Sequence, residues 1–138
     1  MALPYYGLSL YSIYKAKKEN SNSDKTPDLP EYEAIIPARN EKSHIQKAIL
    51  SLVNQTHPPK RIHIVDDASN DGTLDVILST LSTLQETTCN DIKEERLKNQ
   101  KFIVQKCHNS RLNIEFWIWI NKGEPLGKGA SINELVSK

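Results

Sequence analysis

The chain has 138 residues, of which 38% are hydrophobic and 25% are charged, a balance typical of one globular domain rather than of a disordered or collagen-like chain. Its 18 basic and 17 acidic residues leave a net charge of +1, which excludes nucleic-acid binding driven by bulk charge. Two cysteines are too few for a disulfide framework, so a reducing, cytoplasmic location is the simpler interpretation.

Residues 1–30 are expected to form an arm and a linker in front of the folded domain. Residues 1–14 are apolar and aromatic with lysines after them, whereas residues 19–30 are rich in Ser, Asn, Asp, Lys and Pro. The apolar run is shorter than the about 20 residues of a spanning helix, and its positive charge follows it, unlike that of a signal peptide. Two interpretations stay open: an arm that packs on the domain or is disordered, and a membrane contact through residues 1–18 at the cytoplasmic face.

From residue 31 onward, strands and helices are predicted to alternate. An apolar run at 34–36 predicts a buried strand that Pro37 closes, and apolar residues at helical spacing from 45 to 52 predict a helix that ends before Pro58. A β-branched run at 61–65 predicts the second strand. Apolar residues from 74 to 84, again at helical spacing, predict the second helix.

The remaining segment is expected to complete the sheet. The polar stretch 85–101 reads as a surface excursion or a helical extension, residues 102–104 and 114–120 as strands joined by a hairpin, and residues 132–136 as a short helix. This order predicts an α/β fold with a mostly parallel sheet flanked by helices. The loops that follow parallel strands share one edge, where open α/β sheets bind ligands.

Polar loops at that predicted edge point to a nucleotide site. They are residues 37–41 (PARNE), 66–73 (DDASNDGT) and 126–133 (LGKGASIN). Adjacent carboxylates at a strand end repel each other unless something binds there, and a carboxylate accepts the N–H of a nucleobase or the hydroxyls of a ribose. Lys128, between two glycines and near a helix N-terminus, suits a phosphate. Helix capping is the competing interpretation of the acids, and it is preferred for Asp71.

These loops resemble the N-terminal half of the family 2 glycosyltransferases, which have the GT-A fold. The family motifs P-A-[YR]-N-E, N-Q-T, V-D-D-x-S-x-D-G-T and G-K-G-A-x-x-N are similar to residues 37–41, 54–56, 65–73 and 127–133, with Ala68 where Gly is common. The resemblance extends over about 31–138, apart from 85–114, which looks like an insertion. It implies that residues 31–138 form the GT-A-like (Rossmann-like) nucleotide-diphospho-sugar-binding half of the domain.

The resemblance further implies an enzyme of the hexosyltransferase type. A UDP- or GDP-linked sugar would be transferred to an acceptor hydroxyl with inversion. The apolar arm suggests a lipid-linked acceptor, and a polysaccharide acceptor is the alternative. The residues implied to bind the donor are Pro37, Arg39, Glu41, Asp66, Asp67 and Lys128. Among them Asp67 would contact the base, and Lys128 would lie near the base or the diphosphate, whereas the catalytic residues are unknown.

Two parts of the family pattern have no counterpart in this sequence: the Asp-X-Asp site for Mn or Mg and the later catalytic base. We therefore expect the donor-binding half alone, an apparently truncated domain that is inactive in isolation. The alternative is a non-catalytic nucleotide-binding or interaction module with the same fold. Without the missing strands, the face that carries Trp117 and Trp119 is expected to be exposed and to drive self-association.

Overall fold

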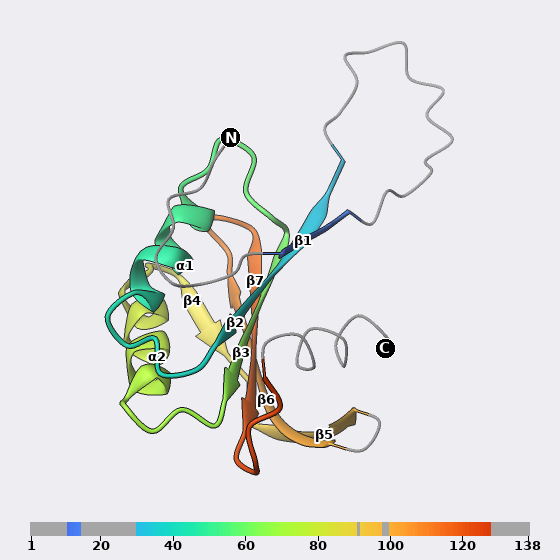
Figure 1. The fold of residues 1–138 in the computed structure, drawn as a ribbon. Helices are drawn as coiled ribbons and strands as arrows, with labels where there is room; N and C mark the ends of the chain where they lie inside the picture. Colours follow the sequence, from blue (N-terminus) through green and yellow to red (C-terminus); the bar gives the residue numbers. More distant parts are fainter. Residues whose placement is uncertain (1–10, 15–29, 91, 98–99, 128–138) are drawn as a thin grey trace.

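The structure is a computed structural model that describes residues 11–14, 30–90, 92–97 and 100–127 (Figure 1). Its strands are β1 (Tyr11–Tyr14), β2 (Tyr32–Ala38), β3 (Arg61–Asp67), β4 (Thr87–Cys89), β5 (Lys93–Leu97), β6 (Gln100–Asn109) and β7 (Ile114–Asn121), and its helices are α1 (Ile45–Val53) and α2 (Thr73–Thr83). The strands form one seven-stranded sheet in the order β1-β2-β3-β7-β6-β4, with β5 also paired to β6. The predicted α/β class is confirmed.

The centre of the sheet is parallel and its flanks are antiparallel. β2, β3 and β7 run in the same direction, so that Ala38, Asp66 and Ile120 lie in register at their carboxyl ends. β1 is antiparallel to β2, and β6 is antiparallel to β7, β4 and β5. The prediction of a mostly parallel sheet is therefore wrong in its proportions, because a short hairpin between β6 and β7 permits antiparallel pairing only.

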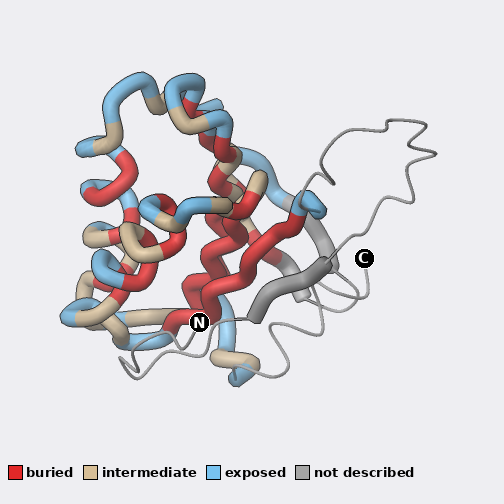
Figure 2. The backbone as a smooth tube through the Cα atoms, turned by 90° about the horizontal axis from the view of Figure 1, so that it is seen from above, coloured by how far each residue is buried: buried red, intermediate tan, exposed pale blue. Residues whose placement is uncertain are grey.

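Side-chain alternation gives the sheet two different faces. α1 and α2 lie side by side against one face (Figure 1), where they bury the larger core cluster, which includes Ile49, Ile64, Ile77, Phe116 and Ile118. The opposite face holds a smaller cluster of Ile35, Val65, Phe102, Val104 and Trp119. Figure 2 shows buried residues along the strands and also on the helical turns that face them. The predicted helix at 132–136 lies outside the described residues.

The expected exposure of the tryptophan face is wrong for Trp119. Its side chain is 1% exposed and packs in the smaller cluster, while Trp117 is half-buried. Among the residues whose side chains the structure describes, Leu78 and Ile92 are the large hydrophobic residues that are exposed. The premise of the expected self-association is thus not met at Trp119.

The polar stretch after α2 forms strands rather than a helical extension. β4 and β5 both pair with β6, and they place Cys89 directly opposite Cys107. These cysteines form a disulfide with their Cα atoms 4.0 Å apart. Their pairing depends on a strand register that the sequence does not reveal, and it removes the argument for a reducing compartment.

Part of the N-terminal arm belongs to the sheet, because β1 pairs with the outer edge of β2. The other residues before 30 lie outside the described ranges. No helix among the described residues has the length and the apolar character needed to cross a membrane.

Candidate functional site

The loops after β2 and β3 are joined to each other by hydrogen bonds at the carboxyl edge of the sheet. The backbone N–H of Asn40 donates to Ser69 Oγ (3.0 Å), and the N–H of Asn70 donates to Asn40 Oδ1 (2.9 Å). The N–H of Glu41 donates to Thr73 Oγ1 at 2.9 Å. These bonds fix the position of two of the three motif loops relative to each other.

Asp71 has a structural role where the loops after β2 and β3 meet. Helix capping was the role preferred for it from the sequence. Its carboxylate accepts the backbone N–H of Thr73 (3.0 Å) and of Lys42 (3.3 Å), and also the Thr73 hydroxyl. Burial acts to raise the pKa of Asp71, but these hydrogen bonds outweigh it and hold the pKa below its ordinary value. Asp71 therefore supports the start of α2 and the neighbouring loop.

The loop after β3 turns sharply at a residue with a left-handed backbone. Ala68 has a φ of 59°, a conformation that costs a residue with a Cβ about 1 kcal/mol or more. Glycine, which the resemblance of this loop to the family motif implies here, would adopt the conformation without that cost. The turn aims the loop across the edge of the sheet.

A cavity of about 530 Å³ opens at this edge, within the range of about 300–1,000 Å³ that small-molecule sites occupy. All three parallel strands contribute to it through their carboxyl ends or the loops that follow. The lining residues are Arg39, Asp66, Ala68, Ser69, Asn70, Leu74, Ile120, Asn121, Lys122, Gly123 and Pro125. The cavity thus combines a buried acid with two basic side chains.

Asp66 is the buried acid in the wall of this cavity. Its side chain is 3% exposed, and its Oδ1 atom has no hydrogen-bond partner among the described residues. Burial raises the pKa of Asp66, with smaller contributions from Asp67 and Asp71, although hydrogen bonds from Ser69 oppose the rise. Since buried polar atoms in folded proteins are normally bonded, the Oδ1 atom is an acceptor whose capacity the described residues leave unused.

Asp67 is bonded to the third loop. Asp67 is 3% exposed, and its Oδ1 accepts from Asn121 Nδ2 at 2.8 Å. The backbone N–H of Leu126 donates to both carboxylate oxygens (2.9 and 3.0 Å), and that of Gly127 donates to Oδ2 (2.7 Å). Asn121 did not stand out in the sequence; its only signal was an amide side chain at the end of a predicted strand.

The other predicted site residues lie at different places. Arg39 is exposed and lines the cavity, whereas Pro37 is buried in β2, opposite Val65 of β3. Glu41 is half-buried, is not among the lining residues, and lies 3.6 Å from His44 Nδ1. Lys128 lies outside the described residues.

The described residues do not fit a metal site of the Asp-X-Asp kind. No group of three or more His, Cys, Asp or Glu side chains comes together in this part of the chain. Consecutive residues of a strand point to opposite faces, so Asp66 and Asp67 do not converge on one point. We assign no step to a metal.

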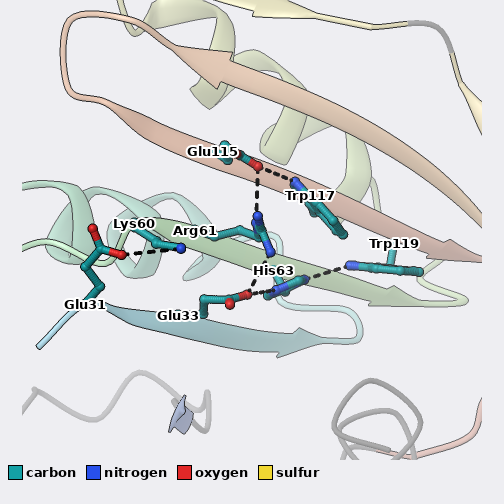
Figure 3. A network of polar contacts seen from close by, with 8 residues as sticks. All are labelled: Glu31, Glu33, Lys60, Arg61, His63, Glu115, Trp117 and Trp119. Atoms are coloured by element: carbon teal, nitrogen blue, oxygen red, sulfur yellow. Dashed lines mark hydrogen bonds and ion pairs between the residues drawn. The ribbon is translucent and has the colours of Figure 1, made fainter. Parts of the chain in front are cut away.

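A polar network lies at the opposite end of the parallel strands, on the face without described helices (Figure 3). Arg61 bonds to Glu33 (3.3 Å) and Glu115 (3.2 Å). His63 joins Glu33 (2.8 Å) to Trp119, whose indole N–H donates to His63 Nδ1 at 3.0 Å. These contacts give His63 a structural role in the network.

Trp117 is part of the same network. Arg61 and Lys106 lie 4.2 Å and 4.0 Å from the centre of its ring, and its indole N–H donates to Glu115. Burial acts to raise the pKa of Glu115, but the Trp117 and Arg61 hydrogen bonds and the Arg61 charge lower it overall. These contacts hold Trp117 in the network as a packing residue.

Comparison with known proteins identifies the family of the domain. Residues 33–100 match the family model described as Glycosyl transferase family 2. No curated protein and no solved structure matched the chain. The match spans β2 to β5 and so includes the first two cavity loops. It also extends over residues 85–100, which were expected to belong to an insertion. The similarity to glycosyl transferase family 2 that the motifs predicted is thus found over residues 33–100.

Proposed function

We propose that this chain binds a nucleoside-diphosphate sugar at the carboxyl edge of β2, β3 and β7, as the donor-binding part of a glycosyltransferase. One observation carries the proposal: Asp66, a buried carboxylate with one oxygen unpartnered among the described residues, lines a cavity of about 530 Å³. The strand and loop that carry this carboxylate belong to the segment that matches the family.

The polar groups at this edge are suited to the parts of such a donor. Asp66 Oδ1 would accept a hydrogen bond from the nucleoside. Asp67, the base contact that the resemblance implies, would act beside the nucleotide through the loop after β7, to which both its oxygens are bonded. The cations Arg39 and Lys122 line the same cavity, and charge-assisted hydrogen bonds from such groups stabilise a diphosphate. Pro37, Glu41 and Lys128 would flank the nucleotide.

The reaction we propose is the displacement of a nucleoside diphosphate by an acceptor hydroxyl. The acceptor oxygen forms a bond to the anomeric carbon, the bond to the diphosphate oxygen breaks, and the configuration inverts. A hexose is the proposed group. This step needs a base for the hydroxyl proton, and we assign that role to none of the described residues. A lipid-linked or polysaccharide acceptor, membrane contact through residues 1–18 and self-association are further proposals that rest on the sequence.

Calorimetric titration with UDP and with GDP, each with and without manganese, tests the proposal. We expect one nucleotide to bind. Asp66→Asn should weaken it about tenfold, because a charge-assisted acceptor becomes a neutral amide at a cost of about 1–2 kcal/mol. Asp75→Asn, an exposed change in the first turn of α2, is the matched control and should bind as the wild type does.

Two results would contradict the proposal: no binding of either nucleotide, or an Asp66→Asn variant with wild-type affinity. A non-catalytic module would show the same binding without transfer. Release of free nucleotide from the corresponding sugar donor in the presence of acceptor separates these two functions.

A further inference from the structure

We infer that Asn121 is a positioning residue of the donor site, which holds the Asp67 carboxylate and the loop after β7 in the shape that forms one wall of the cavity. This inference rests on the proposed donor-binding function and extends it to a residue outside the family motifs.

The Asn121 side chain uses its oxygen and its nitrogen within this loop. Its Nδ2 donates to Asp67 Oδ1 (2.8 Å) and to the backbone oxygen of Glu124 (2.9 Å). Its Oδ1 accepts the backbone N–H of Gly123 at 3.0 Å. Because Asn121 is only 1% exposed, each of these bonds would be costly to leave unmade.

The far end of the loop returns to the same carboxylate. The N–H groups of Leu126 and Gly127 both donate to Asp67. Gly127 has a φ of +87°, a backbone conformation that glycine adopts without strain. Asn121 and Asp67 therefore close the loop at both ends.

The cavity wall lies between these two fixed points. Lys122, Gly123 and Pro125 line the cavity, and no other described strand or helix follows them to hold them in place. Removing the Asn121 amide would free the start of the loop and leave Asp67 without one of its donors. The wall, including the basic group of Lys122, would then lose its position.

The hydrogen bonds of Asn121, Leu126 and Gly127 to Asp67 are called the clamp below. Amide hydrogen exchange at Leu126 and Gly127 tests the clamp without any ligand. In Asn121→Ala, exchange at both amides should accelerate about tenfold or more, the factor that corresponds to losing one hydrogen bond of about 1.4 kcal/mol. Glu124→Gln is the control, because it changes an exposed side chain in the same loop and keeps the backbone oxygen that Asn121 contacts. Its exchange rates should equal those of the wild type.

Asn121→Asp gives a readout that general damage to the fold would not produce. The substitution has the same shape but places two carboxylates at hydrogen-bond distance. They repel each other at neutral pH and can share one proton in acid. We compare the affinity of this variant with that of the wild type, for whichever of UDP and GDP the wild type binds. The ratio of variant to wild-type affinity should be several-fold higher at about pH 5 than at about pH 8. The ratio cancels any effect of Asp66, which both proteins carry.

Unchanged exchange at Leu126 and Gly127 in Asn121→Ala would overturn the clamp. Faster exchange with wild-type nucleotide affinity, or an Asn121→Asp ratio that does not change with pH, would overturn the role in positioning. A wild-type chain that binds neither nucleotide refutes the donor site itself and so overturns the positioning role. The exchange result tells that failure apart from failure of the clamp. If Asn121→Ala does not fold, exchange in Asn121→Asp at neutral pH decides the same question.

Discussion

Asp66→Asn should make the protein more stable at neutral pH while it weakens nucleotide binding. Asp66 is 3% exposed, its Oδ1 has no partner among the described residues, and Asp67 and Asp71 add like charge nearby. Burying a carboxylate in this way costs stability, because its charged form loses hydration without full compensation. Asparagine has nearly the same shape and removes the charge.

The pH dependence of this gain follows from the direction of the pKa shift. The pKa of Asp66 is raised above its ordinary value of 3.8 in the folded protein. The wild type therefore loses stability as the pH rises from 3.8 through the folded-state pKa, and the variant does not. We expect the variant to be more stable at pH 7 by about 1 kcal/mol, since it still buries a polar group. For a chain of this length the gain corresponds to a midpoint about 4 °C higher.

Thermal unfolding followed by circular dichroism between about pH 4 and about pH 8 measures this difference. Asp75→Asn is the control of opposite sign, because that carboxylate is exposed in the first turn of α2, where a negative charge is favourable. The reasoning would be refuted by an Asp66→Asn variant that is less stable than the wild type at neutral pH. A gain that stays constant down to acid pH would refute it as well.

Three further predictions concern stability. Reduction of the Cys89–Cys107 disulfide, which spans 18 residues, should lower the free energy of unfolding by about 3 kcal/mol; denaturant titration with and without a dithiol measures it, and a double serine variant should not respond to the reductant. Glu115→Gln should cost less than about 1 kcal/mol at pH 7, because the carboxylate is 41% exposed. That cost should disappear as the pH falls through the lowered pKa of Glu115; urea unfolding at pH 7 and in acid checks both, and an equal cost at both would contradict the role of the charge. Phe116→Ala, at a side chain 0% exposed in the core, should lower the free energy of unfolding by about 3–5 kcal/mol. A free energy of unfolding, measured by urea titration, within about 1 kcal/mol of the wild-type value would contradict that packing.

The central strands and the functional edge could be predicted from the sequence. The apolar runs at 34–36 and 61–65 predict β2 and β3, although the strands continue to Ala38 and Asp67 and Pro37 does not close β2. Both strands end at the same edge because the connections between them are helical. The hairpin between β6 and β7 was also expected from its turn residues. These features are local, so patterns of a few residues determine them.

Features that depend on register or on the direction of a side chain could not be predicted. Alternation along β3 places Asp66 in the cavity wall and leaves Asp67 bonded to the loop at 126–127, a difference that two adjacent aspartates do not reveal in a sequence. The partnership of Asn121 with Asp67 joins residues 54 positions apart. β4 and β5 are polar because they form the edge of the sheet, and polar residues in short strands resemble a loop.

Mapping nucleotide-induced shifts of backbone amide resonances tests the central claim most directly. On titration with whichever of UDP and GDP binds, we predict that the largest shifts fall in the loops at 39–42, 68–72 and 121–127, at the carboxyl edge. Tyr32, Arg61 and Glu115, at the other end of the same strands, should change little. Shifts confined to that opposite end, or no shifts with either nucleotide, would contradict a donor site at the carboxyl edge.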